Sequence, residues 1–295
     1  MALPSDPLWP RAGGWPAMDD SGDALDAVIV GVPAWRTSLS PTGAHATPAA
    51  VREALRRYSP TLMAGPVDVG ALRVADAGDV PEPDGPDGES AVRSLVAAAR
   101  ARARLVVALG GDNSATYAMA QGAGSAGLIT IDAHFDLRDG VSNGSPVRRL
   151  VEDGFDGRRI VQVGIADFAN SAAYARRARD YGITVIGLDD VRRRGAADVM
   201  AEALEVAGSG GGDIHLDIDV DVCDRSVAPG CPASIPGGLA AWELRALVRA
   251  AASDVHLASA DIVEVDATAD APDGRTVRLA ALCVLELLAG VSLRS

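Results

Sequence analysis

The sequence has few cysteines and few aromatic residues. Three cysteines occur in 295 residues, at positions 223, 231 and 283, and none belongs to a C-x-x-C pair. An odd number at wide spacing offers no disulfide framework, so we expect reduced thiols in a cytoplasmic protein. Aromatic residues make up 4% of the chain and hydrophobic residues 48%. This composition favours helices packed closely on a sheet over an aromatic-rich β-sandwich.

Three other features are lacking: an excess of positive charge, a leader segment and a membrane-length apolar run. The net charge is −13, which repels nucleic acids and anionic membranes, so we expect neither as a partner. The N-terminus lacks a basic stretch followed by an apolar core, which argues against a signal peptide. No apolar run is long enough to predict a transmembrane helix. We expect an extended arm at 1–23 and a single domain at 24–295.

Short apolar runs alternate with segments of helical periodicity. This alternation predicts a parallel sheet covered by helices on both faces, although eight strands would also suit a closed barrel. In both folds, functional groups gather at the carboxyl ends of the strands. The Pro- and Gly-rich stretch 78–90 predicts a surface loop. The expected strands are 27–32, 72–76, 105–109, 128–132, 160–164, 184–188, 214–220 and 258–265, and the expected helices lie near 47–57, 89–103, 114–121, 170–181, 193–207, 241–252 and 276–289.

Polar residues interrupt the apolar pattern at four predicted strand ends. Asp112 and Asn113 follow a glycine pair in GGDNS, and Glu264 lies in DIVEVD. A Gly-rich turn such as GGDNS could hold phosphate, but it lacks the spacing and the lysine of nucleotide-binding loops. The other two clusters have a spacing of two residues: Asp132, His134 and Asp136 in DAHFD, and His215, Asp217, Asp219 and Asp221 in IHLDIDVD.

A spacing of two places side chains on one face of a strand, roughly 6–7 Å apart. Like charges on one face repel each other unless a cation lies among them. Carboxylates at this separation can converge on two metal ions about 3.5–4 Å apart. Oxygen donors with only one or two nitrogens favour Mn²⁺ over Zn²⁺. The sequence therefore predicts a pair of manganese ions at the strand ends.

In order and spacing, the segments GGDNS, DAHFD, DVDVCDRSVAPGCPASIPGG and EV resemble the four signatures of the arginase/agmatinase (ureohydrolase) family. The resemblance covers the chain from about Val28 to its C-terminus. It implies a three-layer αβα fold with an eight-stranded, mostly parallel sheet, which argues against the barrel. It also implies a binuclear manganese centre that hydrolyses a C–N bond of a guanidine or amidine, and a homo-oligomer, either a trimer or a hexamer.

The resemblance also implies roles for single residues. Asp132 and Asp219 would bridge the two ions, and Glu264 would bind the cationic nitrogens of the substrate. Asp136 would accept a hydrogen bond from the attacking hydroxide and pass its proton to the leaving nitrogen. The implied ligand set is Asp132 and Asp219 at both ions, Asn113 and Asp136 at one ion, and His134 and Asp221 at the other. Two residues upstream on the same strand would support the ligands by hydrogen bonding: His215 and Asp217.

Departures from the family pattern point to one branch. Asn113 replaces a histidine ligand, and an amide oxygen is a poorer donor for Mn²⁺ than imidazole, so one metal site is expected to be weak. No histidine follows DAHFD within LRDGVSNGSPVRRL. These features resemble the formimidoylglutamase branch, which converts N-formimidoyl-L-glutamate and water to L-glutamate and formamide. Its substrate carries two carboxylates, which one or more of Arg138, Arg148 and Arg149 could bind. Asn143 and Ser145 could bind the α-amino or a carboxylate group.

Two alternatives remain open. The chain could be an agmatinase or another guanidino-acid hydrolase that releases urea, although cationic side chains after DAHFD would not suit agmatine. It could also be a homologue that lost one metal through Asn113 and acts as a binding or regulatory module. Arg148 could equally lie in solvent on an early helix turn. Because the net charge is −13, any attraction of an anionic substrate must be local.

Overall fold

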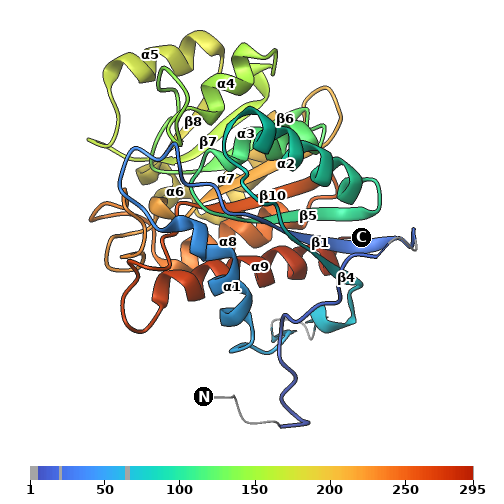
Figure 1. Cartoon of the computed structure of the whole chain (residues 1–295). Helices are drawn as coiled ribbons and strands as arrows, with labels where there is room; N and C mark the ends of the chain where they lie inside the picture. The colour runs from blue at the N-terminus through green and yellow to red at the C-terminus, as the bar shows by residue number, and fades with distance from the viewer. Residues whose placement is uncertain (1–5, 20–21, 64–66, 295) are drawn as a thin grey trace.

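The computed structural model describes residues 6–19, 22–63 and 67–294, and within them eight strands form one sheet (Figure 1). Their order is β4-β1-β5-β10-β9-β6-β7-β8, and every neighbouring pair is parallel. Because β4 and β8 are edges, the sheet is open, and the barrel alternative is wrong. The strands are β1 Leu25–Val32, β4 Val74–Asp79, β5 Ala103–Gly110, β6 Gly127–Ile131, β7 Ile160–Ile165, β8 Thr184–Gly187, β9 Ile214–Asp219 and β10 Leu257–Val263, with β2 Thr61–Leu62 and β3 Val67–Asp68 pairing separately.

Helices cover both faces of this sheet. Figure 1 shows α1, α8 and α9 grouped on one side and α2 and α3 on the other. The α-helices are α1 Thr47–Leu55, α2 Gly85–Arg100, α3 Ala115–Gly122, α4 Pro146–Glu152, α5 Ala172–Tyr181, α6 Leu188–Arg194, α7 Ala196–Gly208, α8 Ala241–Ala252 and α9 Arg275–Leu293. The short 3₁₀ turns are η1 Ala44–Ala46, η2 Val69–Ala71, η3 Gly157–Arg159 and η4 Val220–Val222.

Alternation along the buried strands directs side chains to both faces of the sheet. In β1, Ala27 and Ile29 pack in the core shared with α1, α8 and α9, whereas Val28 and Val30 pack in the core shared with α2 and α3. A strand that is buried on both faces has a continuous apolar sequence, and the run AVIVGV of β1 has this property. The structure is therefore the three-layer αβα arrangement that the sequence predicted.

The C-terminal helix α9 is long and apolar enough to span a membrane by length and composition, with a mean hydropathy of 1.9 over 18 residues. However, 72% of that window is buried inside the protein. Gly290 of α9 lies against α8 so closely that an added Cβ would be 2.3 Å from the Cβ of Ala252. The composition of α9 is therefore explained by packing in the core.

Two local predictions differ from the structure. The stretch 78–90 is not loop throughout, because α2 begins at Gly85, where Pro86 fits the first helical turn and Asp87 is favourable near the helix N-terminus. The helix expected at 193–207 is preceded by a separate short helix, α6, which ends at Arg194 and is followed by Gly195 with a backbone φ of +81°. Helix α4, which begins at Pro146, is absent from the expected helices and was anticipated only by the alternative that places Arg148 on an early helix turn.

Part of the predicted N-terminal arm lies along the edge strand β4. Asp76 of β4 donates its backbone N–H to the carbonyl of Pro16 at 2.8 Å and accepts from the N–H of Met18 at 2.9 Å. Trp15 packs against the core, whereas Trp9 remains 52% exposed. Residues 1–5 and 20–21 of the arm lie outside the described residues. The described part of the arm therefore covers an otherwise open sheet edge.

Candidate metal centre

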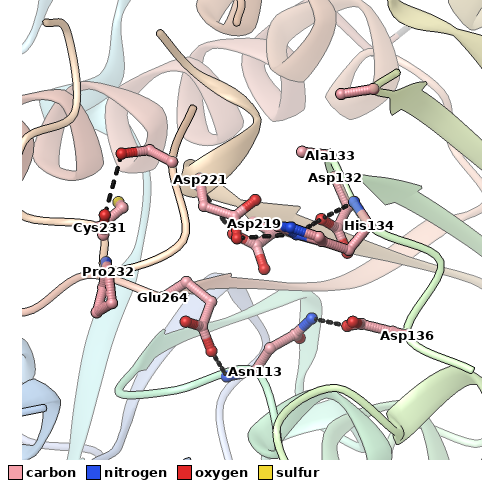
Figure 2. Close-up of polar contacts among 12 residues, drawn as sticks. Asn113, Asp132, Ala133, His134, Asp136, Asp219, Asp221, Cys231, Pro232 and Glu264 are labelled. Carbon is pink, nitrogen blue, oxygen red and sulfur yellow. Dashed lines mark hydrogen bonds and ion pairs between the residues drawn. The ribbon is translucent and has the colours of Figure 1, made fainter. Parts of the chain in front are cut away.

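The predicted site residues meet where four neighbouring strands, β5, β10, β9 and β6, end at one edge of the sheet. Asn113 follows β5, Glu264 follows β10, Asp219 ends β9 and Asp132 follows β6. Parallel strands end on the same side, so residues far apart in sequence converge there. Figure 2 shows their side chains directed into one common space.

The two-residue spacing is produced by turns and not by strand alternation. Asp132 Oδ1 accepts a hydrogen bond from the backbone N–H of His134 at 2.7 Å. Asp219 Oδ1 accepts one from the N–H of Asp221 at 2.8 Å. Strand β6 ends at Ile131, and β9 ends at Asp219. The expected strand from 214 to 220 therefore stops earlier, and an Asp-based turn at each strand end presents the next polar residue.

The side chains form two groups that share one residue. Candidate ligand atoms of Asp132, His134 and Asp221 lie within 4.8 Å of one another, as do those of Asp132, Asp136 and Asp219. His134 Nδ1 is 3.1 Å from Asp221 Oδ2 and 3.4 Å from Asp132 Oδ1. A carboxylate common to both groups is suited to bridge two metal ions.

The donor set fits a pair of divalent cations. Asp132 Oδ2 and Asp221 Oδ1 are buried and have no hydrogen-bond partner among the described residues. A buried carboxylate oxygen without a partner is unfavourable, and a bound cation would compensate it. Four carboxylates and one imidazole are an oxygen-rich set, which suits manganese better than zinc.

The site concentrates negative charge in a buried place, and its pKa values reflect this. Burial, together with the charge of Asp221, raises the pKa of Asp132 from 3.8 to about 6. Burial and Asp132 raise the pKa of Asp136 well above its ordinary value, and burial and Asp221 do the same for Asp219. Burial opposes the charged form of His134, but Asp221 and Asp132 outweigh it and raise the His134 pKa to about 12. Without a cation, the site therefore retains protons.

Asn113 lies beside the second group, but its amide nitrogen faces that group. Nδ2 donates a hydrogen bond to Asp136, and Oδ1 accepts one from Thr116 Oγ1 at 2.6 Å. The Gly-rich turn before it is tight, because a Cβ on Gly111 would lie 2.0 Å from the carbonyl oxygen of Ala34. The turn thus brings Asn113 to the carboxylates, while its role as a ligand through oxygen stays a prediction.

Glu264 and Asp136 both adopt left-handed backbone conformations, with φ of +61° and +53°. Such conformations are unfavourable for residues with a Cβ and are concentrated at functional sites. Glu264 is 5% exposed, and its Oε1 accepts hydrogen bonds from the Asn113 N–H and from Asn143 Nδ2. Burial and the charge of Asp112 raise the pKa of Glu264 to about 8.

His215 and Asp217 form a buried polar layer beneath the site. His215 Nδ1 lies 2.7 Å from Ser259 Oγ, and its Nε2 lies 3.2 Å from Asp261 Oδ2. Asp217 pairs with Asp261 in the β9–β10 register, and neither oxygen of Asp217 has a hydrogen-bond partner among the described residues. These contacts run between β9 and β10 and include none of the predicted ligands, so direct support of the ligands stays a prediction.

A pocket of about 230 Å³ opens onto both groups and is lined by Asp136, Asp219 and Glu264 among others. Arg138 and Asn143 line it too. The Arg138 side chain is exposed, and its guanidinium makes no hydrogen bond or ion pair with the described residues. The pocket lining thus combines acidic side chains with an arginine that is available to a ligand.

The structure does not place Arg148 or Ser145 in the lining of this pocket. Arg148 is buried, with Nε donating to the carbonyl of Arg138 at 2.6 Å and its terminal nitrogens bonded to Glu152 and to the carbonyl of Gly140. Ser145 Oγ donates to the carbonyl of Ser142 at 2.8 Å. Both side chains therefore stabilise the loop that carries Arg138 and Asn143.

Two lining residues, Asn170 and Tyr174, were missed by the sequence analysis. Asn170 Nδ2 donates to the carbonyl of Ala133 at 2.8 Å, and its Oδ1 accepts from the N–H of Phe135 at 3.0 Å. This bidentate contact fixes the DAHFD segment. Both residues belong to the loop and helix after β7, where no sequence pattern signals a contact with the site.

Comparisons with known proteins agree with this geometry. A sequence model described as the Arginase family matches residues 25–290. The chain is 37% identical to a formimidoylglutamase of Halobacterium salinarum, covering 93% of this chain and 90% of that protein. The structure resembles a crystal structure of Bacillus subtilis formimidoylglutamase, with a TM-score of 0.92, 32% identity and coverage of 99% and 95%. It also resembles Trypanosoma cruzi formiminoglutamase with Mn²⁺, with a TM-score of 0.83, 28% identity and coverage of 92% and 95%. The chain therefore belongs to the arginase family.

Proposed function

We propose that the protein is a manganese-dependent formimidoylglutamase. Water adds to the formimidoyl carbon of N-formimidoyl-L-glutamate, the bond from that carbon to the glutamate nitrogen breaks, and formamide and L-glutamate leave. The proposal depends on the pocket, whose lining includes members of both ligand groups and Arg138, a guanidinium with no partner among the described residues. The similarity to formimidoylglutamases of a bacterium and an archaeon supports the same substrate.

Six residues would hold the two manganese ions: Asn113, Asp132, His134, Asp136, Asp219 and Asp221. When bound, the ions lower the pKa of a water molecule so that hydroxide is available near neutral pH. The free oxygen of Glu264 accepts a hydrogen bond from the cationic amidine and orients its carbon. Asp136 takes the proton from the attacking water and delivers it to the glutamate nitrogen as the C–N bond breaks.

Identification of the product tests the proposed function directly. With Mn²⁺ supplied, the purified protein should release formamide from N-formimidoyl-L-glutamate. Release of urea from agmatine or from a guanidino acid, without formamide from the first compound, would establish the rival amidinohydrolase function. Fewer than one metal ion per chain after loading, with no hydrolysis of any amidine or guanidine in the panel, would establish a binding or regulatory module.

Arg138 is expected to bind a substrate carboxylate, since its guanidinium is unpaired in the pocket. Arg138→Gln should raise KM for N-formimidoyl-L-glutamate by about 10- to 100-fold, with a smaller change in kcat, because a hydrogen bond to a charged group is lost. Steady-state kinetics measures this. Arg158→Gln is the matched control, since the Arg158 side chain is 81% exposed and pairs with nearby Asp156. An unchanged KM in the Arg138 variant would remove Arg138 from the substrate site.

Asn113→His should tighten manganese binding by about tenfold, because imidazole is a better donor than an amide oxygen and residue 113 lies next to Asp136. Calorimetric titration of the metal-free protein with Mn²⁺ measures this. Asn113→Leu, which has a similar volume but no donor atom, is the control and should not tighten binding. Equal affinity of the His variant and the wild type would show that residue 113 does not ligate a metal.

The domain organisation, the location and the oligomeric state complete the proposal. We propose one catalytic domain at 24–295 preceded by an arm at 1–23, in a cytoplasmic homo-oligomer that is a trimer or a hexamer. The net charge of −13 supports the absence of nucleic-acid and membrane partners. Sedimentation analysis of the metal-loaded protein tests the oligomeric state, and a monomer would contradict it.

A further inference from the structure

One oxygen of Glu264 is fully engaged by the protein itself. Oε1 accepts a hydrogen bond from the backbone N–H of Asn113 at 2.8 Å and a second from Asn143 Nδ2 at 2.7 Å. Glu264 also lines the pocket, and its Oε2 accepts no hydrogen bond from the described residues. An ionised carboxylate has about four acceptor sites, two on each oxygen. The two on Oε1 are occupied, so only Oε2 is available to a substrate.

The orientation of the Asn143 carboxamide is fixed by a backbone N–H group that can act only as a donor. Its Oδ1 accepts from the backbone N–H of Leu39 at 3.0 Å, and an N–H group can only donate. Nδ2 must therefore point to Glu264. The backbone of Asn143 is held as well, since its N–H donates to the carbonyl of Thr37 at 3.3 Å. At the next position, a Cβ on Gly144 would lie 2.8 Å from Arg138 Cδ, so the loop is closely packed there.

The number of free oxygens on Glu264 matters because a formimidoyl group and a guanidinium have different numbers of terminal nitrogens. A guanidinium attached through one nitrogen has two terminal NH₂ groups, and a carboxylate binds such a pair best with both of its oxygens. A formimidoyl group has a hydrogen atom in place of one NH₂ and presents a single terminal nitrogen. A Glu264 with one free oxygen satisfies the formimidoyl group, whereas it offers no acceptor to the second terminal nitrogen of a guanidinium, and Glu264 itself is buried. Such an unpaired donor is unfavourable.

We propose that Asn143 is a specificity-determining residue, which occupies one oxygen of Glu264 and thereby selects amidines with one terminal nitrogen over guanidines. The inference rests on the proposed function and deepens it. It gives Asn143 a role different from the carboxylate contact expected from the sequence. Asn143 acts through Glu264 and so is a positioning residue for the reacting group.

The test compares two substrates that differ by one group: N-formimidoyl-L-glutamate, which releases formamide, and N-amidino-L-glutamate, which releases urea. The measured quantity is the ratio of their kcat/KM values in the same enzyme preparation, so losses of folded or metal-loaded protein cancel. Wild type should prefer the formimidoyl compound. Asn143→Ser and Asn143→Ala, which both lose the carboxamide donor, should shift the ratio towards the guanidino compound by about tenfold or more.

Ser142→Ala is the matched loop control, since Ser142 Oγ is buried and makes no hydrogen bond with the described residues. Its ratio should equal that of wild type. If a variant has lost turnover, the ratio of the dissociation constants of the two compounds, measured by calorimetry, answers the same question. A wild type that prefers the guanidino compound, or Asn143 variants that keep the wild-type ratio, would overturn the inference while the proposed function stands. A wild type that releases no formamide refutes the proposed function, and the inference with it.

Discussion

Asp132→Asn is expected to reduce hydrolysis at least about a thousandfold, because stabilisation of several kcal/mol by the metal pair would be lost. Asp132 belongs to both candidate ligand groups, whereas the other members each belong to one. The amide nitrogen that replaces one carboxylate oxygen is a donor and cannot ligate a cation. Metal content measured after loading should therefore fall below two ions per chain, in parallel with kcat.

The control for this substitution is Asp139→Asn, the same chemical change seven residues later. Asp139 has an 81% exposed side chain and pairs with Arg177, so its loss should leave metal content and kcat within about twofold, as is usual for surface positions. A variant of Asp132 with two tightly bound ions and near-normal kcat would show that Asp132 does not bridge a metal pair. Loss of activity with full metal content would restrict Asp132 to a role in the reaction itself.

The elements that position the site could be predicted because each has a local signal. Strands β5, β6, β9 and β10 are apolar runs interrupted by acids or amides at their ends. The two-residue spacing of Asp132 and His134 also predicted proximity correctly, although the cause is a turn after β6 and not a shared strand face. A turn based on Asp and a strand both bring residues i and i+2 to one side, so the sequence alone did not distinguish them.

The lining of the pocket could not be predicted, because it depends on contacts between distant segments. Asn143 meets Glu264 across 121 positions of sequence, and Asn170 meets Phe135 across 35. Arg138 and Arg148 were both predicted to contact a substrate carboxylate, and only the structure distinguishes them. Arg138 lines the pocket and has no partner among the described residues, whereas Arg148 is hydrogen-bonded to carbonyl groups of its own loop. In the sequence, both arginines are simply cations that closely follow DAHFD.

The metal-free protein is expected to lose stability as the pH rises from about 5 to 8, and manganese should reverse this loss. Asp132 has a pKa raised from 3.8 to about 6, Glu264 from 4.5 to about 8, and His134 from 6.5 to about 12. Between its unfolded and folded pKa values, each group binds more protons in the folded state, so the free energy of unfolding falls with rising pH. One unit corresponds to about 1.4 kcal/mol, so Asp132 alone accounts for a loss of about 3 kcal/mol between pH 4 and 7, of which roughly 1 kcal/mol falls above pH 5.

Manganese should act in the opposite direction, because the ligands bind metal only when deprotonated and bind it more tightly as the pH rises. At a free concentration 100 times the Kd, one site adds about 2.7 kcal/mol, which corresponds to an increase in Tm of about 5–10 °C for a chain of this size. Thermal unfolding at pH 5.5 and 7.5, with and without Mn²⁺, measures both effects. In Asp132→Asn, the fall in stability of the metal-free protein between these pH values should shrink, since the titration of Asp132 and its charge beside Asp136 and Asp219 are removed. A metal-free wild type equally stable at both pH values, or Mn²⁺ that stabilises more at pH 5.5 than at 7.5, would show that these side chains are not a proton-competing metal site.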